Sequence, residues 1–320
     1  MLLSVVSPAH REEQNLPILY ERLRAVLDAI PGLDWEWVVV DDHSPDGTFA
    51  VLQRLSAADS RVRAVRFSRN FGSHKAILCG LHEARGDAAV VLCSDLQDPP
   101  EVIPRLLEVW RRDGAQVVWA QRAERQGDSA RTVAFAQMYY WLMRRVVGLT
   151  DMPPTGSDVF LLDRAVVDTL SRFNEQHVSL VALLSWVGFR QATITYDRHE
   201  RLHGSSSWSL GKKVRLVIDS VTGFSYLPIR AISVVGLLTA LIGFLYALVV
   251  VGYAFAGNPP AGWSSLMVVL LLAGGLQMLT LGVLGEYIWR ALDQSRQRPP
   301  YIIENRAGPD SRPGGTVDAG

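Results

Sequence analysis

The sequence has little cysteine and no excess of either charge. Two cysteines, Cys79 and Cys93, occur in 320 residues, which excludes a disulfide framework, and neither stands in a zinc-binding spacing. We therefore expect both to be small buried side chains in a reducing compartment. Lys+Arg and Asp+Glu both number 32, so the chain has no overall cationic field of the kind that binds nucleic acid.

Other common signals are also missing. Residues 1–10 carry no basic segment and only a short apolar run, so they predict a first strand rather than a signal peptide. No Gly-x-Gly-x-x-Gly follows that strand and no Walker-type loop occurs, so dinucleotide and P-loop chemistry are not indicated. Residues 307–320 are rich in Gly, Pro and Asp and are expected to be disordered.

Charge is absent from one long segment, because residues 231–285 contain no Asp, Glu, Lys or Arg. The apolar runs at about 231–256 and 263–287 are each longer than the roughly 20 residues that a helix needs to cross a bilayer. They predict a transmembrane hairpin over 229–290; a buried hairpin in a soluble core is the alternative, which such long charge-free runs disfavour. Basic residues flank the pair but not its connecting loop, so the positive-inside rule predicts cytoplasmic termini, with 291–320 as a cytoplasmic tail.

Residues 208–228 precede this hairpin and show apolar residues at helical spacing, with Lys212, Lys213 and Arg215 nearby. The pattern predicts an amphipathic helix lying on the cytoplasmic leaflet of the membrane. An ordinary amphipathic helix packed on a globular domain remains the alternative.

The first 207 residues alternate short β-rich runs with amphipathic helical stretches. The expected strands are 2–7, 35–40, 62–67, 88–93 and 117–120, and the expected helices are 16–30, 48–57, 75–84 and 102–111. This alternation predicts an α/β fold with a mostly parallel, Rossmann-like sheet covered on both faces. Ligands of such sheets bind at the carboxyl ends of the strands.

Polar residues gather where these strands end, at 7–13, 41–48, 68–75, 93–100 and 121–122, which predicts a site at that edge. Asp95 and Gln97 are oxygen donors two residues apart, suited to Mg²⁺ or Mn²⁺. With nearby arginines they suit a nucleotide diphosphate. Some of these polar residues have structural alternatives: Asp42, Ser44 and Asp46 as turn formers and caps, and Asp98 as an N-cap before Pro99.

Four strings then stand out in order along the chain: Asp41-Asp42-His43-Ser44-Pro45-Asp46-Gly47-Thr48, Arg69-Asn70-Phe71-Gly72, Asp95-Leu96-Gln97-Asp98-Pro99-Pro100-Glu101 and Tyr196-Asp197-Arg198-x-Glu200-Arg201. With the hairpin, they make residues 1–305 resemble the inverting family 2 glycosyltransferases of GT-A fold. More narrowly, the chain is similar to polyprenyl-phosphate glycosyltransferases, such as dolichyl-phosphate mannose synthases and bacterial undecaprenyl-phosphate glucosyl- or aminoarabinosyltransferases.

The resemblance implies a cytoplasmic GT-A domain over 1–207 on the inner membrane. That domain would transfer a sugar, with inversion, from a nucleotide-sugar to a polyprenyl (undecaprenyl) phosphate for cell-envelope glycosylation. UDP is favoured over GDP because two-span bacterial relatives mostly use it, and related proteins suggest a homo-oligomer. The resemblance also implies site roles: Pro8, Glu12, Asp41, Asp42 and Ser94 for the nucleotide, Asp95 and Gln97 for the metal, Arg122 and Arg201 for phosphates, and Asp158 near the acceptor.

The sequence departs from the family pattern at Cys93, where the metal motif usually begins with Asp, at Arg11 in place of Asn, and at Ser207 in place of Lys. A thiol offers a hard cation little. These departures support an alternative, a catalytically impaired scaffold that binds a nucleotide-sugar at the membrane. The acids and arginines that are kept favour the enzyme, and a processive polysaccharide synthase would need more spans and a Gln-x-x-Arg-Trp motif.

Two further points stay open. Asp158 has a structural alternative as a capping carboxylate, beside a role in orienting the acceptor or as a weak base. Histidines 10, 43, 74 and 203 match no metal spacing. We interpret them as polar loop residues or phosphate contacts, with His74 and Lys75 the strongest candidates for a functional role.

Overall fold

A computed structural model describes residues 1–122, 137–149, 151–153, 157–173, 179–197, 217, 220–255 and 262–309. The chain divides into two compact units. The first unit comprises Met1–Val217 together with Pro299–Gly320, and the second comprises Ile218–Arg298.

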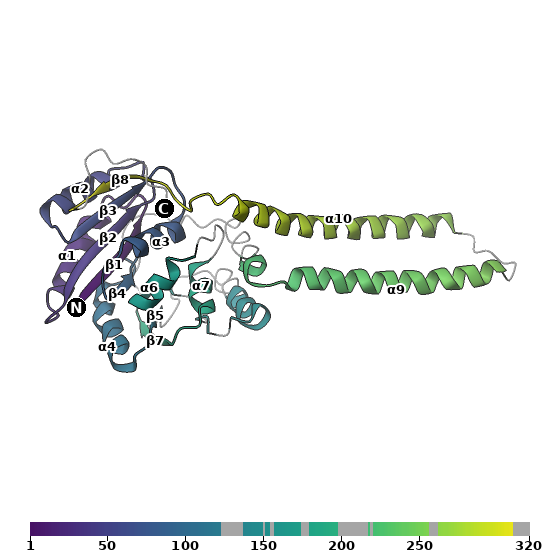
Figure 1. The fold of residues 1–320 in the computed structure, drawn as a ribbon, viewed down its shortest axis with the longest axis horizontal. Helices are drawn as coiled ribbons and strands as arrows, with labels where there is room; N and C mark the ends of the chain where they lie inside the picture. Colours follow the sequence, from purple (N-terminus) through teal and green to yellow (C-terminus); the bar gives the residue numbers. More distant parts are fainter. Residues whose placement is uncertain are drawn as a thin grey trace. The chain divides into compact units, whose positions relative to one another are not determined.

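The first unit is built on one sheet (Figure 1), whose strands follow the order β7-β5-β6-β4-β1-β2-β3-β8. The strands are β1 Leu2–Ala9, β2 Asp34–Asp41, β3 Val62–Phe67, β4 Ala88–Val91, β5 Val117–Arg122, β6 Val159–Asp163, β7 Gln191–Tyr196 and β8 Ile303–Ala307. Only β6 and β8 run antiparallel to their neighbours among the described strands. The predicted α/β fold with a mostly parallel sheet is therefore confirmed, and the carboxyl ends of the parallel strands share one edge.

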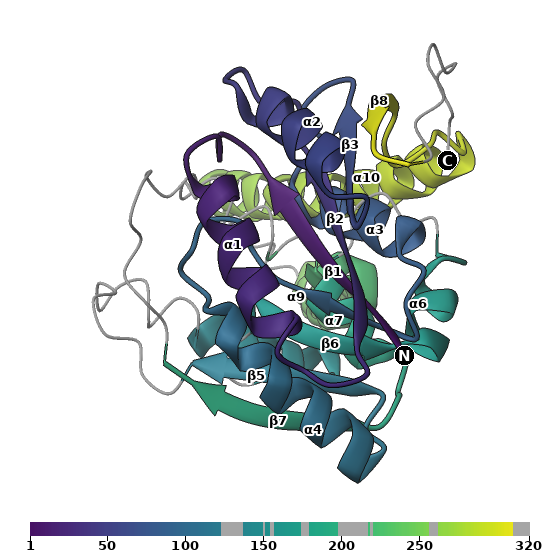
Figure 2. The same ribbon diagram turned by 90° about the vertical axis from the view of Figure 1, so that its left-hand side faces the viewer.

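Helices cover both faces of this sheet (Figure 2). They are α1 Asn15–Leu27, α2 Thr48–Ala58, α3 Ser73–Glu83, α4 Ile103–Asp113, α6 Arg164–Leu170 and α7 Leu180–Trp186, with a short 3-10 helix η1 at Pro100–Val102 and a π-helical turn η2 at Met143–Val147. Val39 and Val40 are consecutive residues of β2, yet they belong to two different core clusters. Since strand side chains alternate between faces, each face of the sheet has its own apolar core.

Strand β4 is shorter than expected, because it ends at Val91 rather than at residue 93. Cys79 is buried in the core between α3 and the sheet, as predicted. Cys93 follows the end of β4 and is partly exposed, so the prediction that both cysteines are buried was wrong for Cys93.

Strand β8 was not foreseen, because residues 291–320 were expected to form only a tail. Ile303–Ala307 pairs antiparallel with β3 at the edge of the sheet. The ring of Tyr301 stacks on Phe67 with the centroids 5.1 Å apart. Residues 310–320, most of the segment expected to be disordered, lie outside the described residues.

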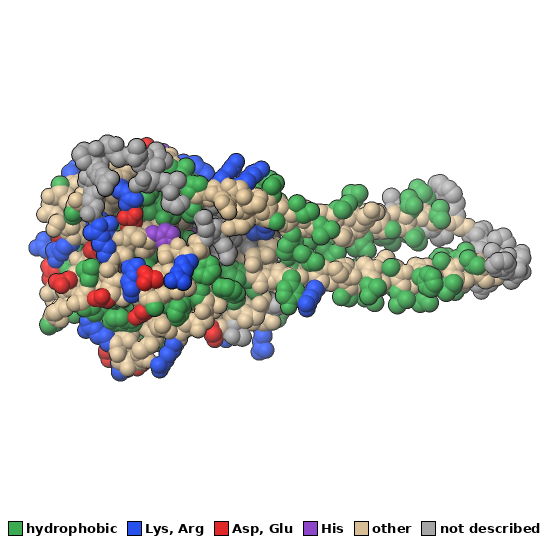
Figure 3. All heavy atoms as spheres, in the orientation of Figure 1, with side chains coloured by type: hydrophobic (Ala, Val, Ile, Leu, Met, Phe, Trp, Pro, Cys, Tyr) green, Lys and Arg blue, Asp and Glu red, His purple; other side chains and the backbone are tan. Residues whose placement is uncertain are grey.

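The second unit contains helices α9, Leu227–Phe255, and α10, Trp263–Ser295. The stretches Leu227–Gly252 and Leu266–Ser295 each contain an 18-residue window, with mean hydropathies of 2.7 and 2.2, and are long and apolar enough to cross a membrane. Hydrophobic side chains cover both helices (Figure 3), and the described ones are largely exposed. Most of the predicted interfacial helix, 208–228, lies outside the described residues.

Candidate functional site

The loops after the parallel strands hold the non-glycine residues with positive φ among the described residues of the first unit. Arg11, His43 and Leu96 follow β1, β2 and β4, and all have positive φ angles, of 63°, 55° and 60°. Left-handed backbone is costly for residues other than glycine and is found mainly where the surrounding structure enforces it, often at functional sites. The edge predicted from the polar strand ends is therefore also the strained edge of the sheet.

Hydrogen bonds tie the loop after β1 to the loop after β2. The backbone N–H of Arg11 donates to Ser44 Oγ at 3.0 Å, and that of Glu12 donates to Thr48 Oγ1 at 2.9 Å. In return, Glu13 Oε2 accepts from the N–H of Gly47 at 2.9 Å. The two loops therefore form one ledge beside Pro8, which contains three predicted nucleotide residues, Glu12, Asp41 and Asp42.

The adjacent carboxylates of this ledge have different partners. Asp42 accepts the backbone N–H groups of Phe71 and Gly72 at 2.6 and 2.9 Å, so it holds the loop after β3. Burial raises the pKa of Asp42, and those two N–H groups oppose the rise. Asp41 is fully buried, and its Oδ1 accepts from the N–H of Ser44 at 2.9 Å. Its Oδ2 lies 3.4 Å from a guanidinium nitrogen of Arg66.

The loop after β4 carries the predicted metal residues. Ser94 Oγ donates to the carbonyl of Pro8 at 3.0 Å, which fastens the ends of β4 and β1 together. Asp95 is 7% exposed, and its Oδ1 accepts from the N–H of Gln97 at 3.2 Å, across the left-handed Leu96. The side chain of Gln97 is partly exposed. Asp95 and Gln97 therefore lie in one tight turn.

The donor set of this turn decides what kind of cation it fits. Among the described residues, no group of three or more His, Cys, Asp or Glu side chains could enclose a metal ion. A single carboxylate with an amide does fit Mg²⁺ or Mn²⁺ that is shared with substrate phosphates, since such ions are commonly held by one or two carboxylates plus phosphate oxygens. The turn suits a shared ion rather than an all-protein cage.

Four side chains from separate elements meet at the ends of β5, β6 and β7, and we name Asp98, Arg122, Asp158 and Tyr196 the β5–β7 cluster. Arg122 forms an ion pair with Asp158, which precedes β6. The Tyr196 hydroxyl donates to the buried Asp98. Burial and the neighbouring Asp98 raise the pKa of Tyr196. Burial lowers the pKa of Arg122, but Asp158 and Asp98 outweigh this effect and raise it overall.

His74, in the first turn of α3, belongs near this cluster. Burial lowers the pKa of its imidazole, and the charge of Asp158 opposes that shift. Its Nδ1 is buried and has no hydrogen-bond partner among the described residues. A neutral imidazole near Asp158 can donate its N–H to an anionic group placed there.

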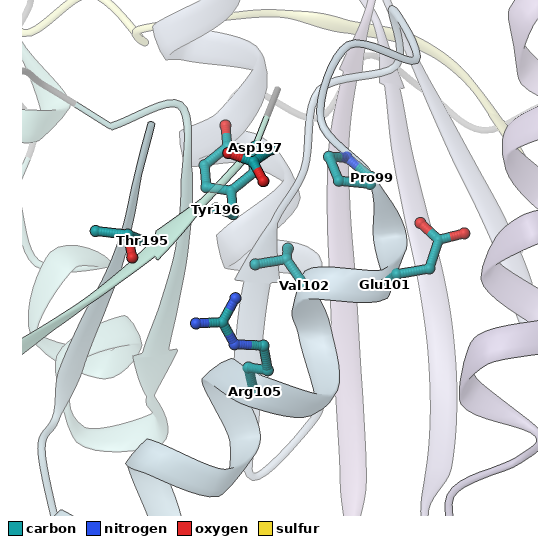
Figure 4. Close-up of a pocket in the computed structure, with 7 residues that line it drawn as sticks. All are labelled: Pro99, Glu101, Val102, Arg105, Thr195, Tyr196 and Asp197. Atoms are coloured by element: carbon teal, nitrogen blue, oxygen red, sulfur yellow. The ribbon is translucent and has the colours of Figure 1, made fainter. Parts of the chain in front are cut away.

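A cavity of about 410 Å³ opens beside the cluster (Figure 4). It lies between the turn after β4 and the end of β7, and it is lined by Pro99, Glu101, Val102, Arg105, Thr195, Tyr196 and Asp197. Figure 4 shows Arg105 reaching from α4 toward the end of β7, while Glu101 points away. Glu101 instead pairs with Arg22 of α1 at 2.7 Å.

The structure brings together most of the predicted site residues. The ends of β1 and β2 hold Pro8, Asp41 and Asp42, and the loop after β1 holds Glu12. The loop after β4 holds Ser94, Asp95 and Gln97. At the end of β5, Arg122 pairs with Asp158. Arg201 lies outside the described residues.

One sequence-based interpretation was wrong, and one residue was missed. Asp98 is not an N-cap, since Pro99 holds that position for η1 and Asp98 instead accepts from Tyr196. Tyr196 had been given no role, although its place at the end of a β-rich run before Asp197 was a usable signal.

Comparison with known proteins matches residues 4–170 to the family model "Glycosyl transferase family 2". The chain is 38% identical to the uncharacterized glycosyltransferase YkcC of Bacillus subtilis, over 97% of this chain and 95% of that protein. It is 36% identical to the bactoprenol glucosyl transferase of Shigella phage SfV, over 95% of this chain and 99% of that protein.

A more distant likeness is to the crystal structure of glucosyl-3-phosphoglycerate synthase from Mycobacterium tuberculosis, with 20% identity and a TM-score of 0.49, covering 68% of this chain and 77% of that one. The family match spans the parallel strands β1 to β5 and the loops that follow them, and the relatives match nearly end to end. The chain therefore belongs to glycosyl transferase family 2, and it is a glycosyltransferase.

Proposed function

We propose that the chain transfers a glycosyl group, with inversion, from a UDP-sugar to a polyprenyl phosphate at the inner membrane. The observation that carries this proposal is the joining, in one chain, of the acidic carboxyl edge of the sheet to two apolar helices long enough to cross a membrane. The near full-length likeness to a protein named bactoprenol glucosyl transferase supports a lipid-phosphate acceptor.

The ledge formed by the loops after β1 and β2 holds the nucleoside in this proposal. Pro8 supplies a rigid wall, and Glu12 supplies a carboxylate for base or ribose. Asp41 is buried beneath the ledge and fixes its shape by accepting from the N–H of Ser44. Asp42 and Ser94 act in the same way, because their described bonds fasten the loop after β3 and the carbonyl of Pro8. Their contribution is to keep the ledge in shape.

Asp95 and Gln97 hold the divalent cation, Mg²⁺ or Mn²⁺, together with the donor diphosphate. When bound, the ion neutralises charge that develops on the departing nucleoside diphosphate. Cys93 adds little to this binding because a thiol is a poor ligand for a hard cation. The buried position of Asp95 and its bond to the N–H of Gln97 keep its carboxylate oriented before the donor arrives.

Arg122 and Asp158 handle the acceptor. The lipid phosphate is anionic near neutral pH, so one of its oxygens can attack the anomeric carbon without strong deprotonation. The new bond joins that carbon to the acceptor oxygen, and the bond to the nucleoside diphosphate breaks with its electron pair leaving on the diphosphate. Arg122, fixed by Asp158, orients the nucleophile, and Arg201 is proposed to assist at the phosphates. In this scheme Asp158 positions Arg122 rather than acting as a strong base.

The membrane arrangement is also part of the proposal. The catalytic domain is assigned to residues 1–207 with β8 added from the far end of the chain, and α9 and α10 anchor it with both termini in the cytoplasm. The arginines and lysines before and after the apolar helices support this topology.

Transfer from a panel of radiolabelled UDP- and GDP-sugars to undecaprenyl phosphate, in detergent with Mg²⁺, Mn²⁺ or EDTA, tests the proposal. A lipid-extractable product that forms with one UDP-sugar, and is lost with EDTA, is the expected result. Nucleotide binding without lipid-linked product from any donor would overturn it in favour of a scaffold. If the protein hydrolysed the donor sugar at the same rate with and without the lipid, only the assignment of polyprenyl phosphate as acceptor would be wrong.

A further inference from the structure

The strand that follows α10 reaches the ledge through one arginine. Arg66, on β3, contacts three groups with its guanidinium. Its Nε lies 3.0 Å from Glu304 Oε2 on β8, its Nη2 donates to the carbonyl of Ser44 at 3.3 Å, and its Nη1 lies 3.4 Å from Asp41 Oδ2.

These contacts include a buried carboxylate oxygen at the base of the ledge that has no hydrogen bond among the described residues. Asp41 Oδ2 is buried and has no hydrogen-bond partner among the described residues, so the charge of Arg66 is what stabilises that oxygen. A guanidinium presents a planar fork of donors, and the shorter reach of an ammonium group would not serve all three groups together. Arg66 therefore sets where the Asp41 carboxylate and the Ser44 carbonyl lie.

Glu304 supports the same loop by a second route. His43, which carries the strained φ of 55°, hydrogen-bonds through Nδ1 to the carbonyl of Phe67 at 2.9 Å. That nitrogen also lies 3.6 Å from Glu304 Oε2. One carboxylate from β8 thus faces both the arginine that holds Asp41 and the left-handed residue that turns the chain after Asp42.

We infer that Glu304 and Arg66 are positioning residues for the donor nucleotide, so that the strand after the second apolar helix completes the donor site. This inference rests on the proposed function, in which the ledge that Asp41 helps to shape holds the nucleoside. A role in the donor site explains why the chain, after α9 and α10, returns to the first unit and pairs β8 with β3. Only residues 296–302 separate the end of α10 from the start of β8.

The same strand supplies a matched control. Arg306, two residues after Glu304, pairs with Glu83 of α3 at 2.6 Å, and Arg306 is 33% exposed in its side chain against 48% for Glu304. The Arg306–Glu83 pair also fastens β8 to the first unit, but it does so through α3. If β8 acts only by stabilising the sheet, loss of either pair should have the same consequence.

Isothermal titration of the full chain in detergent with UDP, and separately with GDP, in the presence of Mn²⁺, tests the inference. Glu304→Gln and Arg66→Lys are expected to raise the Kd for the nucleotide about three- to tenfold, the effect of a partly exposed charge-assisted network. Arg306→Gln is expected to leave the Kd within about twofold of wild type. The double variant Glu304→Gln/Arg66→Lys should bind more weakly than Arg66→Lys alone by less than the full effect of Glu304→Gln, because Glu304 acts partly through Arg66 and partly through His43.

Steady-state kinetics separate positioning from stability. For Glu304→Gln, the KM for the UDP-sugar should rise while kcat and the KM for undecaprenyl phosphate stay unchanged, and the melting midpoint should match that of Arg306→Gln. Equal nucleotide affinity in wild type and Glu304→Gln, or an equal loss in Arg306→Gln, would overturn the inference and leave the proposed function standing. If wild type bound neither nucleotide, the proposed function would fail and the inference with it.

Discussion

The amino and carboxyl edges of the parallel sheet differ in which residues adopt left-handed backbone angles. At the amino edge, left-handed backbone is assigned to glycines, namely Gly32, Gly114 and Gly188, which precede β2, β5 and β7. At the carboxyl edge Gly72 also has a positive φ, but three non-glycine residues, Arg11, His43 and Leu96, adopt such angles there too. Glycine accepts such angles without strain and the other residues do not. The amino edge is therefore relaxed and the carboxyl edge is held under strain.

Charged side chains at the two edges also differ in how they are paired. At the amino edge, Glu36 accepts from Ser4 Oγ at 2.6 Å and the N–H of Arg85 at 2.7 Å, and it pairs with Arg63 at 3.1 Å. Arg61 pairs with both Asp28 and Asp59. These acids are paired with arginines and stabilise the fold, whereas Asp41, Asp42 and Asp95 at the carboxyl edge are buried in loops. Stability gained at one edge offsets strain at the other.

The largest expected effect follows from removing Asp95 at the carboxyl edge. Asp95→Ala should lower the rate of sugar transfer by about 10³-fold or more, because the cation and the diphosphate lose their carboxylate. The melting midpoint and membrane insertion should stay close to wild type, since Asp95 lies in the turn after β4, where it accepts from the N–H of Gln97, and not in the hydrophobic core. Asp28→Ala, at the amino edge, is the control and should keep full transfer. Wild-type turnover in Asp95→Ala would remove this residue from the mechanism.

The reciprocal change at the amino edge is Glu36→Gln. It removes a buried charge that serves Arg63, so the free energy of unfolding should fall by about 2–3 kcal/mol. This corresponds to a melting midpoint lower by roughly 5–10 °C, measured in detergent. Transfer per folded molecule should be unchanged. A loss of transfer at an unchanged midpoint would show that the two edges are not separate in function.

The ion pair between Asp59 and Arg61 makes the free energy of unfolding depend on pH. The ion pair and hydrogen bonds with Arg61 lower the pKa of Asp59 to about 2. A carboxylate with a lowered folded pKa stabilises the protein above its unfolded pKa of about 3.9, and that contribution is lost as the pH falls toward 2. Since Arg61 is partly exposed, we expect on the order of 1 kcal/mol. The melting-midpoint difference between wild type and Asp59→Asn should be constant from pH 7 to 5 and shrink below pH 4. A difference that grew on acidification would contradict the pairing.

The smallest effects come from the backbone itself. Arg11→Gly should raise the free energy of unfolding by about 0.5–1 kcal/mol, because a strained φ is relieved and the side chain that is lost is exposed and contributes little packing. Gly114→Ala, at a φ of 60° before β5, should lower it by about 1 kcal/mol. Thermal melting of the two variants beside wild type measures both. If both shifts had the same sign, the contrast in strain between the edges would be wrong.

The amino-acid sequence predicts much of this fold because the strands are local features. Runs such as residues 35–40 and 62–67 carry their own β pattern, and the charge-free segment identifies the apolar helices. The strand ends likewise locate the site, because parallel strands bring their carboxyl ends to one edge.

What could not be predicted depends on residues far apart in the chain. Tyr196 and Asp98 are 98 residues apart, and Arg66 and Glu304 are 238 apart. Residues 303–307 have no strong β pattern of their own and form a strand because the edge of β3 offers unpaired backbone groups. Asp98 was mistaken for a helix cap because an Asp-Pro pair is typical of one, and the fold placed Tyr196 beside it instead.

The central claim is that the carboxyl edge transfers a sugar to a lipid phosphate, and one assay tests it most directly. Wild type, Asp95→Ala and Glu36→Gln are incubated with a radiolabelled UDP-sugar and undecaprenyl phosphate, and the label in the lipid extract is divided by the amount of folded protein. The account predicts equal labelling by wild type and Glu36→Gln and none by Asp95→Ala. Labelling by Asp95→Ala at the wild-type level, or its absence in wild type with every donor sugar, would contradict it.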